Sequence, residues 1–404
     1  MRLRPLALGA FVCACAGGEA IAQQPPGVGS ERQIHGFVSV TGTYDSNFAR
    51  SNKATAAARA VKPREYLLAP KAGLNVVQPF GRQVVYLNGS AGYDFHRENS
   101  QLDRRRYDVQ GGYVTSLGMC QLSAVETFRA AQSDLADLDG VNTRNELRAI
   151  GTSLSTSCGR PTGIAVSGSV SRLDAKNSAA LQKPADSTLE SLSLQVGYSN
   201  ENLGRFSLVY SYADTEMPNR ITPGRPVGDG FWSETYALSV ERDLGSRLTL
   251  SAQGGRTRLK REFAPPGVPQ EIKTTTYSGQ AAYRIGSRMS VNLSGERTIK
   301  PAQRAGKLYD VTTGAQVSGQ YQLGTRYTLS AGYSIRDVDS NADTLSARPV
   351  ITNSRNNSVF GSVRYQQSEL ASLVLDVRYE ERDTDLPEFN YSAMRVGITA
   401  QVGF

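Results

Sequence analysis

Apolar and polar residues alternate with a period of two along most of this chain, and this alternation limits the folds open to it. In VVYLNGSAGYDF (84–95), Val85 and Leu87 fall on one face of an extended chain, and Asn88 and Ser90 fall on the other. The same pattern recurs in TTYSGQAAYRIG (275–286) and RYTLSAGYSI (326–335). Successive side chains of a strand point to opposite faces, so the pattern predicts many β-strands with one apolar face. No segment after residue 22 has the pattern of a transmembrane helix.

A short turn motif with a central glycine links these strands, and glycine supplies the positive φ that a tight hairpin needs. The motif occurs as FGRQ (80–83), LGSR (244–247), IGSR (285–288), LGTR (323–326) and, shortened, LGR (203–205). Other connections are long, polar and rich in Pro and Gly, as at 216–230 and 262–271. Short turns therefore alternate with long loops, as in an up-and-down barrel of about eighteen strands. The expected strands are 34–48, 65–78, 83–96, 104–117, 120–132, 144–158, 162–173, 188–199, 205–214, 231–243, 247–259, 272–285, 288–299, 309–323, 326–338, 354–367, 371–383 and 390–404.

The second face of these strands decides between a soluble sheet and a membrane barrel. It carries Ser, Thr, Gln, Asn and Gly with a few charges, which a soluble core could not bury but a water-filled lumen can hold. The sequence thus predicts an all-β transmembrane antiparallel up-and-down barrel over 34–404, with short periplasmic turns, long extracellular loops and both termini on the periplasmic side. A soluble β-sandwich or β-solenoid is the alternative.

Aromatic residues of the apolar face gather near the strand ends, as in the two girdles of an outer-membrane barrel. The residues expected at the outer girdle are Tyr93, Phe95, Tyr107, Tyr212, Tyr277, Tyr379 and Tyr391. Those expected at the periplasmic girdle are Tyr198, Phe206, Tyr283, Tyr321, Tyr327, Tyr365 and Phe404.

The first residues have the pattern of an export signal. Two arginines precede a short apolar run, and small residues suit cleavage after Ala22. We expect a signal peptide at 1–22 and a short periplasmic segment at 23–33. Cys13 and Cys15 lack the preceding pattern of a lipoprotein signal. Cleavage removes two Arg and one Glu, so the formal charge falls from +8 to +7. A basic exported protein favours anionic neighbours, and export makes nucleic acid an unlikely partner.

Two cysteines remain after this cleavage, and in an oxidising compartment they predict one disulfide. Cys120 begins one expected strand and Cys158 ends the next. Folding the chain at Asp139-Gly140, midway between them, sets the two cysteines opposite each other at the periplasmic rim. This register places Glu126 on the apolar face, so the strand has a bulge at Glu126 or the register differs locally.

Charged residues on the polar face are expected to line the lumen. The basic ones are Lys71, Arg106, Arg129, Arg284, Arg336, Arg364, Arg378 and Arg395, and the acidic ones are Asp94, Asp108, Glu241, Glu296 and Asp376. The excess of positive charge favours the passage of anions. As an alternative, Arg364, Asp376, Arg378 and Arg395 pair with each other and brace the wall. Basic residues at 104–106 and 256–261 are expected at the outer rim, where they bind lipopolysaccharide phosphates or receive an anionic polymer.

The residues offer little for catalysis or for a cofactor. The chain has two His, at 35 and 96, and no cluster of His, Cys, Asp and Glu has the spacing of metal ligands. Gly306-Lys307 lacks the upstream glycine of a phosphate-binding loop. We therefore expect no enzyme, no metal and no cofactor. A surface hydrolase that uses His96, near the outer end of its strand, is the remaining enzymatic hypothesis.

The segment VSVTGTYDSNFAR (38–50), with the strand rhythm and Phe404, resembles the outer-membrane porins encoded in exopolysaccharide gene clusters, which are distantly like the alginate-export porin. This resemblance implies a passive channel that exports a polysaccharide with periplasmic export components as partners. The alternative is a general or anion-selective diffusion porin, with 216–230 as an inward-folded constriction loop. Further expected partners are outer-membrane lipid, lipopolysaccharide and the barrel-assembly machinery, which would read Phe404 as its signal.

Overall fold

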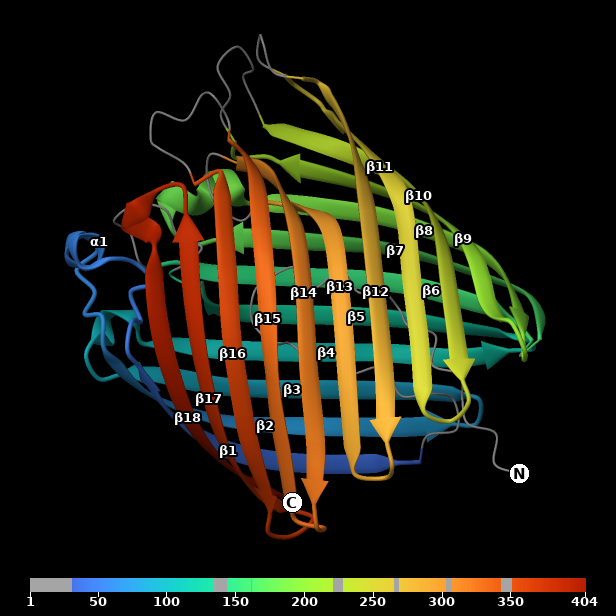
Figure 1. The fold of residues 1–404 in the computed structure, drawn as a ribbon, viewed down its shortest axis with the longest axis horizontal. Helices are drawn as coiled ribbons and strands as arrows, with labels where there is room; N and C mark the ends of the chain where they lie inside the picture. The colour runs from blue at the N-terminus through green and yellow to red at the C-terminus, as the bar shows by residue number, and fades with distance from the viewer. Residues whose placement is uncertain are drawn as a thin grey trace.

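The chain forms one closed antiparallel sheet of 18 strands (Figure 1). The computed structural model describes residues 31–133, 135, 144–160, 162–220, 228–264, 269–302, 307–342 and 351–404. Each strand pairs with its neighbours in the sequence, and β1 pairs with β18, which closes the barrel. The predicted fold class is therefore confirmed. Strands at the front of the barrel cross those at the back steeply, as the tilt of barrel strands requires (Figure 1).

The strands and helices follow in this order: β1 (Gln33–Asp45), α1 (Lys53–Ala58), β2 (Glu65–Phe80), β3 (Gln83–His96), η1 (Ser100–Leu102), β4 (Arg104–Leu117), β5 (Cys120–Gln132), β6 (Glu146–Gly159), β7 (Gly163–Asn177), η3 (Ala180–Ala185), β8 (Ser187–Asn200), β9 (Gly204–Met217), β10 (Asp229–Leu244), β11 (Leu248–Arg261), β12 (Glu271–Ile285), β13 (Met289–Pro301), β14 (Lys307–Leu323), β15 (Tyr327–Ala342), β16 (Asn353–Gln366), β17 (Ala371–Thr384), η4 (Pro387–Phe389) and β18 (Tyr391–Gly403). Among the described residues, no helix has the length and apolar character needed to cross a bilayer.

All the expected strands are present, and the largest boundary differences lie at their outer ends. β7 runs on to Asn177 and β15 to Ala342, each four residues past its expected end. β1 stops early, because the Asp45 side chain accepts a hydrogen bond from the Asn47 amide at 2.9 Å and turns the chain. The expected signal peptide at 1–22 and most of 23–33 lie outside the described residues.

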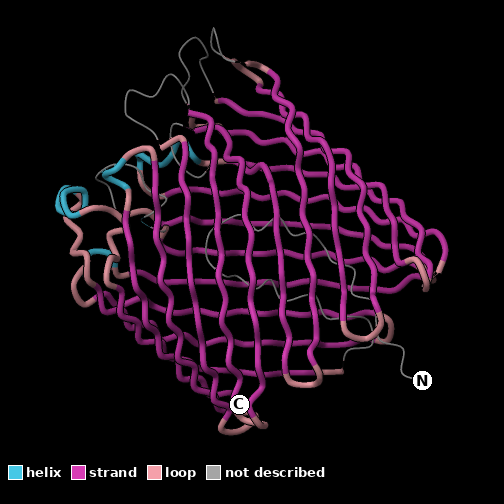
Figure 2. Tube along the Cα trace, in the orientation of Figure 1, coloured by secondary structure: helices cyan, strands magenta, loops and turns pink. Residues whose placement is uncertain are grey.

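The glycine turns are built as the motif predicts. Gly245 and Gly286 have φ of 66° and 64°, and each begins a three-residue connection between paired strands. Strands make up most of the described chain, and turns and loops join them at their ends (Figure 2). The turns gather at the end of the barrel where the sequence placed the periplasm.

The two faces of the wall separate by chemistry. The convex face carries the large exposed apolar side chains, among them Val38, Leu208 and Ile398. The concave face is polar, and its side chains crowd together, so that even small ones such as Ser39 and Ser207 are at most 5% exposed. All the expected girdle residues lie on the outer face except Tyr391. That residue pairs with Arg382 on the inner face, so its assignment to the outer girdle is wrong.

The seam between β1 and β18 joins the two ends of the sheet. Gly36 and Phe404 exchange backbone hydrogen bonds of 3.0 and 2.9 Å, and Thr41 and Thr399 share a side-chain hydrogen bond of 2.9 Å. A side chain at residue 36 would collide with the Phe404 ring, so glycine here leaves room for that ring on the outer face. The alternating last strand thus ends inside the closed sheet rather than at an exposed edge.

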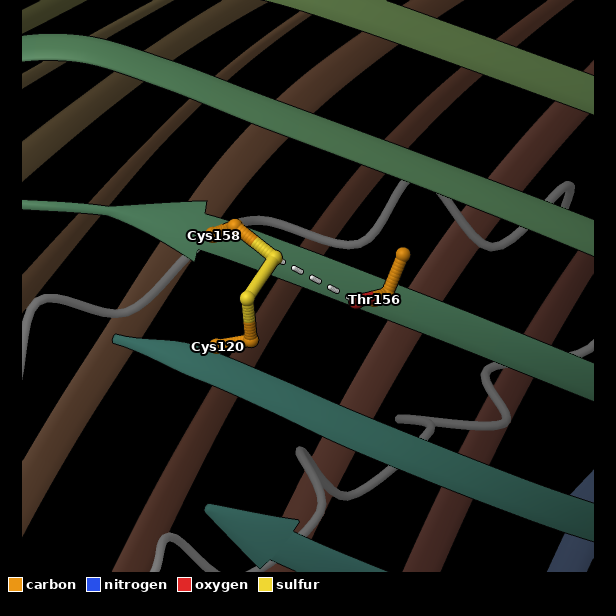
Figure 3. Close-up of a disulfide and its surroundings, with 3 residues drawn as sticks. All are labelled: Cys120, Thr156 and Cys158. Atoms are coloured by element: carbon orange, nitrogen blue, oxygen red, sulfur yellow. Dashed lines mark hydrogen bonds between the residues drawn. A yellow bond between two sulfur atoms is a disulfide. The ribbon is translucent and has the colours of Figure 1, made fainter. Parts of the chain in front are cut away.

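A disulfide links β5 and β6 at the turn end of the barrel (Figure 3). Cys120 and Cys158 are direct partners in the strand register, with their Cα atoms 4.0 Å apart. The Cys158 sulfur also lies 3.8 Å from the Thr156 hydroxyl. The expected turning point at Asp139-Gly140 lies outside the described residues.

Glu126 lies on the outer face, and the pairing around it is regular. β5 continues past Glu126 without a bulge, opposite Gly111 on β4 and Thr152 on β6. The local register was therefore correct, and neither explanation offered for Glu126 is needed. The Thr152 hydroxyl donates to the Glu126 carboxylate at 3.0 Å, which satisfies part of its hydrogen-bonding capacity among apolar neighbours.

Two small apolar clusters lie at the outer end of the barrel. The first joins the β1–β2 loop to its neighbours through Ala49, Ala56, Val61, Leu102 and Leu135. The second contains Met217, Phe231, Leu259, Leu308 and Tyr309. The Phe231 and Tyr309 rings are 6.0 Å apart although β10 and β14 are four strands apart around the wall. Four strand spacings amount to roughly 19 Å, so the mouth is pinched here.

The suggested constriction loop at 216–230 is described only at its ends. Arg220 forms an ion pair with Asp229 at 3.5 Å, and its guanidinium donates to the Lys307 carbonyl at the start of β14. The ends of this loop therefore belong to the pinched side of the mouth. Residues 221–227, where a constriction would have to form, lie outside the described residues.

Candidate functional site: the barrel lumen

The strand register places all thirteen of the predicted lumen charges on the inner face. In the strand register, Arg395 lies opposite Asp45, Lys71 lies opposite Ser39, and Arg378 lies opposite Arg395. The same reasoning, carried from strand to strand, covers the rest: Arg106, Arg129, Arg284, Arg336, Arg364, Asp94, Asp108, Glu241, Glu296 and Asp376. Alternation determines only which face of the wall a residue occupies. Whether its charge is neutralised depends on the ion pairs that it forms.

Arg336, Arg364, Arg378 and Arg395, on β15 to β18, and Lys71 on β2 form what we call the basic wall. Among the described residues, Arg336, Arg364 and Arg395 form no ion pair. Arg378 lies 3.8 Å from Glu380, and Lys71 sits 5.4 Å from the centre of the Phe37 ring.

The structure does not show the alternative bracing network. In the described part of the chain, Arg364, Asp376, Arg378 and Arg395 form no ion pairs with one another. Asp376 lies instead beside Gly397, where an added side chain would meet its carboxylate. Within the described residues, the positive charges of Arg336, Arg364 and Arg395 are therefore not neutralised by ion pairs, and they face the lumen.

Other predicted lumen charges are neutralised by neighbours. Arg106 binds Asp94 at 2.9 Å, and Glu241 lies 4.0 Å from Arg205 on the next strand. Asp108 and Arg129 are direct register partners on β4 and β5. These groups have neighbours of opposite charge, in contrast to Arg336 and Arg364 of the basic wall, which form no ion pair among the described residues.

The inner face of β5 to β9 is lined by serine hydroxyls, and we call this surface the hydroxyl wall. Within the described residues, the inner faces of β6, β7 and β8 carry no charged side chain. Two hydroxyls of this wall, Ser171 and Ser191, share a hydrogen bond of 2.7 Å. Since β7 and β16 are half a circuit apart in the ring of strands, the hydroxyl wall faces the basic wall. Its serines are Ser123, Ser153, Ser155, Ser157, Ser167, Ser169, Ser171, Ser187, Ser191, Ser193, Ser199, Ser207 and Ser211.

A buried ionic cluster at the mouth was not predicted from the sequence. Arg50, from the β1–β2 loop, binds the Asp45 carboxylate at 2.8 Å and Glu380 at 2.9 Å, and the Arg50 and Asp45 side chains are 8% and 7% exposed. The Arg50 guanidinium also lies over the Tyr391 ring at 5.6 Å. This cluster fixes the β1–β2 loop to the inner face at the top of the basic wall. Asp45 at the end of an alternating strand, before a turn sequence, was the only available signal.

The two histidines have structural surroundings. His96 is buried beside Asp103, with Nδ1 3.4 Å from the carboxylate, and its ring lies 5.2 Å from the Phe48 ring. His35 lies on the inner face near the periplasmic end, against Gly403. Over the described ranges, no three His, Cys, Asp or Glu side chains are grouped so that they could hold a metal ion.

The two basic segments are divided between the faces of the wall. Arg256, Arg258 and Lys260 point outward from β11, whereas Arg261 points inward. In the other segment Arg105 is outward, and its neighbours in the sequence, 104 and 106, are inward. Only part of each segment can therefore contact lipid.

No protein-family model matches the sequence, and no curated protein matches it either. Solved structures match in fold. OccK2 (OpdF) of Pseudomonas aeruginosa covers 94% of this chain and 100% of its own length, with a TM-score of 0.50 and 13% identity. A BenF-like porin from Pseudomonas fluorescens covers 92% and 99%, with a TM-score of 0.49 and 14% identity.

The chain thus has the fold of the bacterial outer-membrane porins. The likeness to OccK2 concerns the fold alone, and it gives no support to a place in the exopolysaccharide-cluster or alginate-export families.

Proposed function

We propose that this protein is a passive channel of the outer membrane that favours anionic solutes. The observation that carries the proposal is the basic wall, in which Arg336, Arg364 and Arg395 face the lumen without an ion-pair partner among the described residues. Fixed positive charge in a confined aqueous channel lowers the barrier for anions and raises it for cations. Such a function requires no catalytic residue, metal or cofactor.

The hydroxyl wall supports a more specific choice of solute. Serine hydroxyls both donate and accept hydrogen bonds, and they suit a solute that carries hydroxyl groups. The opposite basic wall suits a carboxylate, which Arg can bind with two parallel hydrogen bonds. A small hydroxylated acid, such as an acidic sugar, presents both kinds of group. We therefore propose acidic sugars as the preferred solutes.

Export of an anionic exopolysaccharide is the second candidate. It is favoured by the distribution of the basic wall, which extends from Arg364 near the turns, through Arg378 in mid-strand, to Arg395 opposite the outer end of β1. A row of cations along the lumen suits a chain with repeated negative charges. In this candidate the resemblance of the first strand, from Tyr44 to Phe48, reflects a shared role, and periplasmic export components are the partners.

The proposed location follows from the same fold. An outer-membrane barrel is exported with a cleaved signal, here 1–22, and is inserted by the barrel-assembly machinery, which we propose reads Phe404. Its apolar outer face meets lipid and lipopolysaccharide. Fractionation of cells that express the protein, with N-terminal sequencing of the mature chain, tests these points together.

Ion selectivity in planar bilayers tests the proposed channel. We expect a salt gradient to give a reversal potential of the sign for anion preference. The Arg336→Gln, Arg364→Gln, Arg395→Gln triple variant should move that potential toward the value of an unselective pore. Arg355→Gln is the matched control, because Arg355 faces outward and binds Asp337 at 2.7 Å. An unchanged reversal potential in the triple variant would remove the basic wall from the mechanism.

The same bilayers separate the two solute classes. An acidic monosaccharide should reduce the ion current of the wild-type channel reversibly, and more strongly than a neutral sugar of equal size. A purified anionic polysaccharide that blocks the current, when the monosaccharide does not, would favour export instead. Equal block by neutral and acidic sugars would refute the acidic-sugar proposal.

A further inference from the structure

The outer face of β10 to β13 contains a groove in the middle of the apolar band. Its volume is about 580 Å³, and its lining is almost entirely apolar. Leu238, Val240 and Tyr277 form its sides, and Gly254, Gly279 and Gly295 form its floor. A groove of this kind exposes backbone to the membrane unless something fills it.

The backbone does not require these glycines. Their φ values are not positive, since none of them is among the described residues with φ in that range. A side chain at residue 254 would meet nothing within 4 Å, and at residues 279 and 295 the nearest atoms would be backbone oxygens at 3.7 and 3.6 Å. Larger residues would fit there, so neither φ nor close packing of the wall requires glycine.

Two arginines lie at the outer end of the groove on the same outer face: Arg297 is level with Tyr277 and Gly254, and Arg256 is one row higher. Arg256 is two residues beyond Gly254 on β11, and Arg297 is two residues beyond Gly295 on β13. Neither forms an ion pair in the part of the chain that the structure describes. The Arg297 guanidinium donates to the Thr313 hydroxyl at 2.7 Å. The neighbouring Arg258, in contrast, is engaged by Glu271 at 2.7 Å.

The spacing of the two guanidinium groups suits one phosphate. β11 and β13 are separated by β12 alone, and Arg256 lies two residues further along the strands than Arg297, so the two Cα atoms are roughly 12 Å apart. Arginine is long enough for both side chains to reach a phosphate between them, and it binds phosphate with two parallel hydrogen bonds. An unpaired cation on the lipid face is costly away from the interface, and an anion from the lipid layer would remove that cost.

From the groove and the two neighbouring arginines, Arg256 and Arg297, we infer a binding site for a phosphorylated, saturated glycolipid of the lipid A type. One acyl chain fills the groove over Gly254, Gly279 and Gly295, and a phosphate binds between Arg256 and Arg297. Tyr277 lies beside both parts, because it is the register partner of Gly254 on one side and of Arg297 on the other. This inference rests on the proposed outer-membrane location, and it is independent of anion transport.

Native mass spectrometry of the delipidated barrel tests the site, with bis-phosphorylated lipid A titrated as the probe. We expect one tightly bound lipid. Arg256→Gln and Arg297→Gln should each weaken binding about fivefold, because a basic residue near anionic lipid contributes about 1 kcal/mol. Gly279→Leu should weaken binding by filling the groove. The matched controls are Arg355→Gln and Gly361→Leu, outward positions on β16 where a side chain also has room.

The outcomes separate the possible occupants. Loss of binding in the arginine and groove variants, with both controls unchanged, supports the site. Unchanged lipid A binding in those variants overturns it. Equal affinity for phosphatidylglycerol of matched chain length overturns the assignment to lipid A, and a second protein copy lost from the Gly279→Leu spectrum would show that the groove is a protein interface. The reversal potentials of the same variants should equal that of the wild type, so channel selectivity and lipid binding are tested independently.

Discussion

The buried cluster at the mouth gives a prediction whose size can be worked out from contacts. Arg50→Met keeps an unbranched apolar side chain and removes the guanidinium and its charge. The Asp45 carboxylate then loses two hydrogen bonds, of 3.0 and 2.8 Å, and Glu380 loses its contact at 2.9 Å. Asp45 is almost fully buried and loses its ion-pair partner, keeping only Arg395 opposite it in the strand register, whereas Glu380 keeps Arg378 at 3.8 Å.

Removing one partner of a buried ion pair costs about 3–5 kcal/mol. We take about 3 kcal/mol, the lower limit of that range, since Glu380 retains a partner. The cost falls on the β1–β2 loop rather than on the sheet, because the strands keep their backbone hydrogen bonds. The opening equilibrium of residues 46–64 should therefore rise roughly a hundredfold.

Hydrogen exchange of the folded barrel in detergent measures this opening. Amides of residues 46–64 should exchange about a hundredfold faster in Arg50→Met, and the strand amides should be unchanged. Adding Asp45→Asn and Glu380→Gln should recover most of the protection, because the uncompensated charges are gone. Equal exchange in wild type and Arg50→Met, or a triple variant that opens more than the single one, would refute the reasoning.

Three further predictions concern stability and assembly. Cys158→Ser removes a disulfide that spans 38 residues, and it should lower the free energy of unfolding by about 3–4 kcal/mol, measured from urea midpoints. Equal midpoints for the oxidised and reduced wild-type protein would contradict this. Burial acts to raise the pKa of Asp385, but hydrogen bonds from the Thr352 hydroxyl and amide outweigh it and hold the pKa below the usual 3.8. Because the pKa of Asp385 is lower in the folded protein, its contact with Thr352 stabilises the fold fully above pH 3.8, and this stabilisation is lost as the pH falls below that value. An acid-induced loss of stability that persists in Asp385→Asn would argue against this origin. Phe404→Ala removes the ring that covers Gly36, and we expect less assembled barrel with unchanged single-channel conductance; normal amounts of the variant in the outer membrane would exclude a role in assembly.

Local sequence signals predicted the wall because each of its features has a local cause. The glycine turns needed positive φ, and strict alternation placed the lumen charges on one face. The error at Tyr391 came from giving residue type more weight than register, since alternation counted back from Val396 places Tyr391 inside.

Features that depend on distant residues could not be read in this way. Arg50 meets Glu380 only after the barrel closes, and the groove over Gly279 needs four strands side by side. The hydroxyl wall was visible as serines strand by strand, but its place opposite the basic wall depends on the circular order of the strands.

The seam also constrains the order of events during folding. Thr41 and Thr399, which share a hydrogen bond, are 358 residues apart in the sequence, so their contact carries a very high loop-closure entropy. Until it forms, β1 and β18 are both bare strand edges, able to pair with strands of other chains. Hairpins between neighbouring strands can form early and locally, whereas closure must wait until β18 has been synthesised. The polypeptide therefore has to be kept from aggregating throughout its passage to the membrane, and we expect closure of this seam to be the slow, committing step of biogenesis.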